Sequence, residues 1–450
     1  MKKISVLEVL IVFLAFSATL FAYPSVYPTG TTIYKPDAAW SGYTIHPTPD
    51  SKGTVLIDMN GNVIRRWANV TGGPARILPG GIFVGRSDQT GELLQLDWEG
   101  NVVWGFSEAL DSRGNSISAE TQHHDWQREG FSAGYYAPES EPRVVGGKTL
   151  LLLNKSVVVP EISDHQLLDD YLVEVSWDGE VLWEWLASEH VDEMGFSAVA
   201  REAIRNSTVG NPGDGPTDWL HFNAAAYLGP NQWHDRGDER FHPDHVIFSS
   251  REANLVGIIA RSGKIVWRLG PDFRETEEME SIGQIIGQHN PHFIPPGLPG
   301  EGNVLVFDNG GAAGYGASTA TAPNGRNIVE RRYSRVLEIN PVTMEKVWEY
   351  SISGHGNFRF FSWNVSSAQR LPNGNTLITE GAPGRVFEVT VDGEIVWEYV
   401  NPFFYESDDT RHNMYRAYRV PYDWIPQLER PDERAVIPPH PSEFRVEAQR

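Results

Sequence analysis

The chain has 450 residues, of which 40% are hydrophobic and 11% aromatic, and this content excludes a globally disordered chain. Its formal net charge of -22 excludes a basic face that would follow nucleic-acid phosphates, so we expect no nucleic-acid partner. The chain has no cysteine, which excludes disulfides, thiolate nucleophiles and cysteine metal sites.

The N-terminal segment, residues 1–22, resembles a secretory signal peptide. Lys2 and Lys3 precede a mostly apolar run, which is the pattern of such leaders. We therefore expect a secreted or periplasmic protein, in contact with a membrane only if the segment stays uncleaved as an anchor. Residues 23–450 are expected to form a single domain.

A short motif recurs six times in the rest of the chain. Each copy has a turn, a charged or polar residue, two apolar residues and a tryptophan, and most copies follow another short apolar run. The tryptophans are Trp67, Trp104, Trp183, Trp267, Trp348 and Trp397. Hairpins repeated at a long, irregular period are typical of a β-propeller, whose blades are four-stranded antiparallel sheets.

A second pattern precedes the hairpins and predicts the first strand of each blade. Five such segments begin at Ala75, His123, Trp219, Gln288 and Ser366, one fewer than the number of tryptophan turns. The turn nearest the N-terminus lacks one, and the segment that begins at His412 has the right composition to supply it. We therefore predict an all-β, six-bladed β-propeller of four-stranded antiparallel blades, closed by the C-terminal segment.

Two insertions interrupt this pattern. Residues 186–206 have helical spacing, whereas residues 311–329 are rich in glycine and are expected to form a loop over the site.

Histidines recur near the start of the predicted first strands. They are His124 (with His123 before it), His221, His289 and His412. First strands line the central channel of a propeller, so these side chains are expected to meet at one end of the axis. One histidine in a strand is most often a satisfied polar residue, but four at equivalent repeat positions indicate a shared site.

Several segments together resemble the arylsulfate sulfotransferases. In chain order they are YPTGTTIYKPDAAWSGYTI, HHD, DWLHFN, SSR, QHN, FDNGG, YSRVLEI and the run from LPNGNTLITEG to GRVFEVTVDGEIVWEY. The resemblance extends from Tyr27 to Pro426. It implies a six-bladed propeller outside the cytoplasm that moves a sulfuryl group from a phenolic sulfate ester to another phenol. It also implies a sulfated histidine, with no nucleotide sulfate donor, metal or other cofactor.

The resemblance also implies which residues form the site. His221 and His289 match the channel histidines of the family, His124 is a third candidate, and His412 is a further catalytic candidate. A neutral imidazole can act as the nucleophile, and a second one can carry the phenol proton. The candidate substrate-binding residues are Arg251, Arg335, Asn290, His292, Asp308 and Asn309.

Two positions depart from the family pattern. The family has an arginine soon after FDNG, whereas in this chain the next arginine is Arg326. The covalent histidine expected in the following blade is missing, because residues Phe361 to Tyr399 contain no histidine. His355 and His412 flank this span, and either could replace it only if the fold brings it to the axis.

Two other functions stay open at this point. A metal-dependent propeller hydrolase would need His123, His124, Asp125, Asp308 and Asn309 to surround a cation. A propeller that has lost the covalent step would bind aryl sulfates without turnover. Our first hypothesis is an arylsulfotransferase-like enzyme with a small-molecule aryl sulfate donor and a phenolic acceptor.

Overall fold

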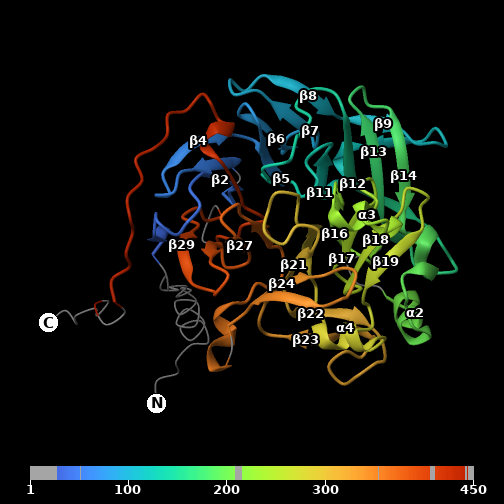
Figure 1. Ribbon diagram of the computed structural model, residues 1–450. Helices are drawn as coiled ribbons and strands as arrows, with labels where there is room; N and C mark the ends of the chain where they lie inside the picture. Colours follow the sequence, from blue (N-terminus) through green and yellow to red (C-terminus); the bar gives the residue numbers. More distant parts are fainter. Residues whose placement is uncertain are drawn as a thin grey trace, which may run out of the picture.

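The computed structural model describes residues 28–50, 52–207, 215–352, 354–405, 411–440 and 443. Six antiparallel sheets surround one axis as the blades of a β-propeller (Figure 1), so the predicted fold class is confirmed. The expected leader, residues 1–22, lies outside the described residues. Within the described part of the chain, no helix is long and apolar enough to cross a membrane.

Each blade has four strands that follow one another outwards from the axis. In this order the strands of blades 1 to 3 are β30 (Tyr418–Val420), β2 (Tyr43–Pro47), β3 (Thr54–Ile57) and β4 (Val63–Trp67); β5 (Val70–Leu78), β6 (Ile82–Ser87), β7 (Leu93–Leu96) and β8 (Val102–Phe106); and β11 (Gln122–Arg128), β12 (Lys148–Val157), β13 (Leu167–Ser176) and β14 (Val181–Leu186). The strands of blades 4 to 6 are β16 (Phe222–Tyr227), β17 (Val246–Ser250), β18 (Leu255–Ile259) and β19 (Ile265–Leu269); β20 (His289–Phe293), β21 (Val304–Asp308), β24 (Arg335–Ile339) and β25 (Lys346–Tyr350); and β26 (Ser367–Arg370), β27 (Thr376–Glu380), β28 (Arg385–Val389) and β29 (Ile395–Val400).

Both ends of the chain close the ring. The C-terminal strand β30 pairs with β2 and thereby supplies the first strand of blade 1, with Val420 opposite Tyr43. The N-terminal strand β1 (Gly30–Tyr34) pairs with β29 and adds a fifth, outer strand to blade 6. The predicted closure by the C-terminal segment is confirmed, and it removes an edge that another chain could otherwise extend.

The repeated tryptophan joins each blade to the next one. Its indole N–H donates to a backbone carbonyl in the turn between the third and fourth strands of the following blade, at 2.8–3.2 Å. The pairs are Trp104 with Trp177, Trp183 with Arg261, Trp267 with Pro341, Trp348 with Val391 and Trp397 with Met59. The ring of Trp67 instead contacts Trp98 edge-on at 5.9 Å. In five blades the tryptophan thus combines apolar packing with a hydrogen bond to the next blade, which suits an indole at this position.

The two insertions form regular structure. Residues 186–206 contain a 3-10 helix, η2 (Ala187–Glu193), and the helix α2 (Ala198–Arg205), which Ser197 caps. Residues 311–329 were expected to form a loop, but they fold into most of a hairpin of β22 (Gly311–Tyr315) and β23 (Arg326–Arg331). The hairpin contacts α2, and the Tyr315 hydroxyl donates to the carbonyl of Trp219 at 2.5 Å. This tertiary support holds a glycine-rich segment in a strand.

The remaining elements are short. They are β9 (Glu108–Leu110), β10 (Ser116–Ser118), β15 (Thr217–Asp218), α3 (Gln232–Asp235), α4 (Glu277–Ile282), and the 3-10 helices Ala119–Thr121, Glu239–Phe241, Gly354–Arg359 and Tyr422–Trp424.

Buried ion pairs connect the first strands next to the axis. Asp125 on β11 accepts from Arg76 on β5 at 2.8 Å and from Arg416, which precedes β30, at 3.0 Å. All three side chains are at most 1% exposed. Arg416 also donates to the carbonyl of Asn223 on β16 at 2.6 Å. The C-terminal segment therefore links blades 1 to 4 through charge as well as through strand pairing.

Replacing Arg416 with methionine should lower the free energy of unfolding by about 3–5 kcal/mol, because Asp125 then keeps only one cationic partner in a buried site. Denaturant unfolding measures this change. The control is Arg274→Met, since Arg274 is 84% exposed and its ion pair with Asp272 contributes less than about 1 kcal/mol. A loss no larger than that of the control would contradict the structural role of Arg416.

Candidate active site

Three of the four predicted channel histidines meet at one end of the axis. His124 lies on β11, His221 directly precedes β16, and His289 is the first residue of β20. The ring centroids of His124 and His221 are 4.8 Å apart, and those of His123 and His124 are 5.2 Å apart. His289 is close enough to lower the pKa of His124 through charge. Blades 3, 4 and 5 therefore each bring one imidazole to this site.

A shared backbone irregularity positions these side chains. His124, His221 and Asn290 all have positive φ, at 52°, 51° and 53°. The strand register breaks at or just after these residues, between Gln122 and Trp126 on β11, between Phe222 and Ala224 on β16 and between His289 and His292 on β20. Such a residue costs on the order of 1–3 kcal/mol, and the bulge redirects side chains out of the regular ladder. The strain recurs where the strands enter the site.

The protonation state of His289 follows from its neighbours. Its Nδ1 lies 3.0 Å from the Gly287 carbonyl and 2.8 Å from Oδ1 of Asn309. The amide of Asn309 is oriented by its own donation to the carbonyls of Ser362 and Val365, so Oδ1 must face the imidazole. Both partners of Nδ1 are acceptors. The proton is therefore on Nδ1, and Nε2 keeps its lone pair.

The Nε2 atom of His289 is available for chemistry. Burial, followed by the charge of Arg251, lowers the pKa of His289 well below 6.5, so the imidazole is neutral at pH 7. Among the described residues, the Nε2 atom has no hydrogen-bond partner. It does not belong to the fully buried atoms without a partner, so part of its surface is open. A neutral imidazole with a free lone pair is a nucleophile.

His221 forms a dyad with Asp218. Its Nδ1 lies 2.5 Å from Oδ2 of Asp218, the last residue of β15. Burial would raise the pKa of Asp218, but the hydrogen bond and charge of His221 outweigh this, and the pKa is lowered. The ionised carboxylate accepts from Nδ1 and fixes the orientation of the ring, as in the dyads that carry protons in catalysis.

His124 is oriented by Tyr415, a residue that no sequence pattern indicated. The Tyr415 hydroxyl donates to the carbonyl of His124 at 2.8 Å, and its oxygen lies 3.0 Å from Nδ1 of the same residue. Burial raises the pKa of Tyr415, so the hydroxyl keeps its proton and must accept from Nδ1. Burial, followed by the charge of His221, lowers the pKa of His124 well below 6.5. His124 is therefore neutral, with its lone pair on Nε2.

His412 does not join the other three, which corrects the prediction. Its Nδ1 lies 2.9 Å from the carbonyl of Asn401, and its ring stacks on Phe404 with centroids 4.9 Å apart. Tyr415, three residues later, reaches the site instead. The side chain of His355 lies outside the described residues.

Asp308 and Arg335 hold the loop before His289. Asp308 accepts from the backbone N–H of Ile286 at 2.9 Å and pairs with Arg331 and Arg335 at 2.6 and 2.7 Å. Arg335 also donates to the carbonyls of residues 282–284. These contacts correct the prediction that the two residues touch substrate: they keep His289 in place.

The fold occupies His292, against the prediction, whereas the substrate-binding role of Asn290 stays a prediction. His292 is 1% exposed, and both of its ring nitrogens are occupied. Its Nδ1 donates to the Asn290 carbonyl, and its Nε2 accepts from the Tyr135 hydroxyl, both at 2.9 Å. The Asn290 side chain is buried. Asn309 likewise orients His289 and does not need to contact a substrate.

Two arginines supply positive charge near the histidines, since the charge of Arg251 acts on His289 and that of Arg326 on Asp218. Glu252 lies between Arg251 and Arg326 and pairs with both, at 2.9 Å for Arg326. The three groups carry one net positive charge, which suits an anion. Arg326 comes from β23, so the hairpin returns to the site the arginine that the sequence lacks after FDNGG. Its buried NH1 has no partner among the described residues.

The predicted metal ligands do not surround a cation. Asp125 and Asp308 are each bound by two arginines, which compete with any metal for the carboxylate. In the part of the chain that the structure describes, no three histidine or acidic side chains are grouped to hold a metal ion.

Comparison with known proteins identifies the family. The family model described as Arylsulfotransferase (ASST) matches residues 90–402. The chain belongs to this arylsulfotransferase family. The resemblance inferred from the sequence is thereby confirmed. A search of curated proteins finds no match.

Solved structures similar to this arylsulfotransferase family member share little sequence with it. A protein of unknown function from Bacteroides caccae is 10% identical, with 85% of this chain and 99% of that chain covered and a TM-score of 0.43. A streptogramin B lyase is 12% identical, with coverage of 84% and 85% and a TM-score of 0.37. Virginiamycin B lyase from Staphylococcus aureus is 10% identical, with coverage of 84% and 87% and a TM-score of 0.36.

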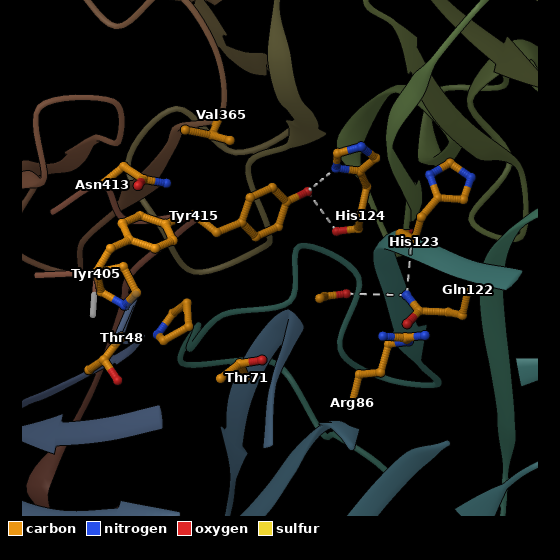
Figure 2. Close-up of a pocket in the computed structure, with 13 residues that line it drawn as sticks. Thr48, Thr71, Arg86, Gln122, His123, His124, Val365, Tyr405, Asn413 and Tyr415 are labelled. Atoms are coloured by element: carbon orange, nitrogen blue, oxygen red, sulfur yellow. Dashed lines mark hydrogen bonds between the residues drawn. The ribbon is translucent and has the colours of Figure 1, made fainter. Parts of the chain in front are cut away.

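A cavity of ≈ 420 Å³ in this family member opens beside His124 (Figure 2). Residues from blades 1, 2 and 3 and from the segment before β30 line it, among them Arg86, Gln122, His123, His124, Tyr405 and Tyr415. Its size suits an aromatic ring with substituents, and its tyrosines offer surfaces for stacking.

The imidazole of His289 should be neutral at pH 6.0, because burial and Arg251 lower its pKa, whereas an unperturbed imidazole with a pKa of about 6.5 would be mostly protonated. Nitrogen-15 NMR of the histidine rings measures this, and the His289→Ala variant assigns the signal. The proton should be seen on Nδ1. An imidazolium at pH 6.0, or a proton on Nε2, would contradict the hydrogen-bond assignment.

Proposed function

We propose that this chain transfers a sulfuryl group from an aryl sulfate to a phenol, with His289 as the nucleophile. The observation that carries the proposal is the free Nε2 lone pair of a neutral His289 beside Arg251. Family membership supports sulfotransferase chemistry in general. The assignment of the nucleophile is new, because the position where the family's covalent histidine is expected lies in a stretch without histidine.

The reaction needs two steps. In the first, Nε2 of His289 forms a bond to sulfur while the bond between sulfur and the phenolic oxygen breaks, and the leaving phenolate takes a proton from the His221 imidazolium. In the second, an acceptor phenol gives its proton to His221, and its oxygen bonds to sulfur as the nitrogen–sulfur bond breaks. Each step is an in-line displacement at sulfur, comparable to phosphoryl transfer.

The surrounding charges favour both steps. Arg251 and Arg326 can stabilise the sulfuryl oxygens. The sulfated imidazole becomes positively charged. The Gly287 carbonyl and Oδ1 of Asn309 stabilise this charge by accepting hydrogen bonds from Nδ1. His124 lines the cavity next to His221, so the incoming phenol passes its imidazole to reach His221. These side chains thus have complementary roles in the transfer.

One assay tests the proposal. Purified protein is incubated with p-nitrophenyl sulfate, with and without an acceptor phenol, and with and without a chelator. Release of p-nitrophenol that requires the acceptor and survives chelation is expected. Release that needs no acceptor and is lost with chelator would instead indicate a metal hydrolase. Binding of aryl sulfates without turnover would indicate a propeller that has lost the covalent step.

His289→Ala should abolish turnover in this assay, because no sulfated intermediate can form. The matched control is His245→Ala, since His245 precedes β17 at the end of blade 4 opposite His221. Circular dichroism checks that both variants fold, and mass spectrometry of the wild type with donor alone should find one added sulfuryl group. Activity retained by His289→Ala would remove this residue from the mechanism.

Asp218→Asn should lower kcat by about 10²-fold or more, because the amide cannot stabilise the His221 imidazolium that protonates the leaving group. Donors with a more acidic phenol need less protonation, so their kcat should fall less. Asp192→Asn is the control, as Asp192 is 87% exposed in a surface ion pair. Equal losses for all donors would argue against proton transfer by His221.

We also propose that the protein acts outside the cytoplasm, because residues 1–22 have the pattern of a secretory leader. N-terminal sequencing of the protein from the extracellular or periplasmic fraction tests this, and an intact Met1 in a cytoplasmic fraction would contradict it.

A further inference from the structure

Arg86 lacks the carboxylate partner that several arginines near the axis have. Arg76, Arg326, Arg335 and Arg416 are each paired with a carboxylate. Arg86, on β6, instead donates only to the carbonyl of Glu120 at 3.2 Å, and its Nε is buried without a partner. No carboxylate among the described residues pairs with it. Within the part of the chain that the structure describes, its charge has no ion-pair partner, and it lines the cavity beside His124.

The cavity itself is unusual for this protein. The chain has 59 acidic residues, yet none of the described residues that line the cavity is acidic. Its charged and titratable groups are Arg86, His123, His124 and two tyrosines, and its other polar groups include Gln122 and Asn413. An anion inside this cavity meets a cation and hydrogen-bond donors, and the carboxylates of Asp88 and Asp170 lie behind the lining residues Thr71 and His123.

The arrangement separates this cation from the reacting groups. In Figure 2, Arg86 and His124 lie at separate edges of the cavity, with Gln122 between them and Tyr405 on the far side. Gln122 is held by donation to the carbonyls of Gly73 and Asp125. A phenol whose oxygen faces His124 can therefore extend its ring into the cavity and present a distant substituent to Arg86.

We propose that Arg86 binds a second anionic group on the phenolic substrate, so that phenols with a carboxylate remote from the reacting oxygen are preferred over neutral phenols. This substrate class rests on the sulfuryl transfer proposed above. Arginine suits the role, because its planar guanidinium can bind a carboxylate through two parallel hydrogen bonds.

The first test compares p-hydroxyphenylacetate with its methyl ester as acceptors at pH 7, with p-nitrophenyl sulfate as donor. The wild type should prefer the carboxylate by roughly tenfold or more in kcat/KM, the size of one charge-assisted hydrogen bond. Arg86→Gln should remove most of this preference through a higher KM for the carboxylate. Arg86→Lys should keep an intermediate preference, since it retains the charge but not the paired hydrogen bonds.

The control is Arg274→Gln, which removes the same charge at an exposed site and should leave the preference at its wild-type value. A wild type with no preference for the carboxylate would overturn the inference. An Arg86→Gln variant whose kcat/KM falls equally for the acid and for the ester would also overturn it, because this would indicate a structural role of Arg86.

A binding measurement separates this inference from the proposed function. Calorimetric titration with p-hydroxyphenylacetate and with its ester needs no turnover. If no acceptor is sulfated but the wild type binds the acid more tightly and Arg86→Gln does not, the transfer reaction is wrong and the anion site stands. If both compounds bind equally to the wild type, the anion site is wrong whatever the assay of turnover finds.

Discussion

Asp125 is held between Arg76 and Arg416 next to the propeller axis, and the site depends on this buried contact. Its second carboxylate oxygen also accepts from the backbone N–H of Ala225 at 3.3 Å, so one side chain connects four blades. Removing two charges from water has a large cost, which only close pairing offsets. The arrangement therefore tolerates one register of the first strands. His124 directly precedes Asp125, so the same contact fixes where this imidazole lies.

The outer part of each blade is connected by a different interaction. Five of the repeated tryptophans donate to a carbonyl of the next blade. These bonds are neutral, lie far from the axis and leave the channel free for charged groups. The polar interior and the aromatic contacts between blades thus depend on separate strands. Closure by β30 and β1 completes the ring and places Arg416 and Tyr415 at the centre.

The site shows how one residue type acquires several roles. Through Nδ1, His289 donates to two acceptors, His221 donates to the Asp218 carboxylate, and His124 donates to the Tyr415 hydroxyl oxygen. Burial keeps His289 and His124 neutral, whereas the hydrogen bond and charge of His221 lower the pKa of Asp218. His292, three positions along β20 from His289, has both nitrogens occupied and serves the fold. The neighbours of each imidazole, rather than its position in the repeat, decide its chemistry.

The sequence by itself determined the number of blades, their closure and the gathering of histidines at one end of the axis, because the hairpins repeat and histidines recur near the start of the first strands, where a local pattern reveals them. Only the tertiary structure decided that Tyr415 rather than His412 reaches the site, since both lie on one short segment without a distinguishing pattern. The tertiary structure also decided that a glycine-rich stretch forms a hairpin, which brings Arg326 to the site. It decided as well that Asp308 and Arg335 hold the loop before His289. Each of these depends on hydrogen bonds or ion pairs between residues far apart in the chain, which composition and spacing do not record.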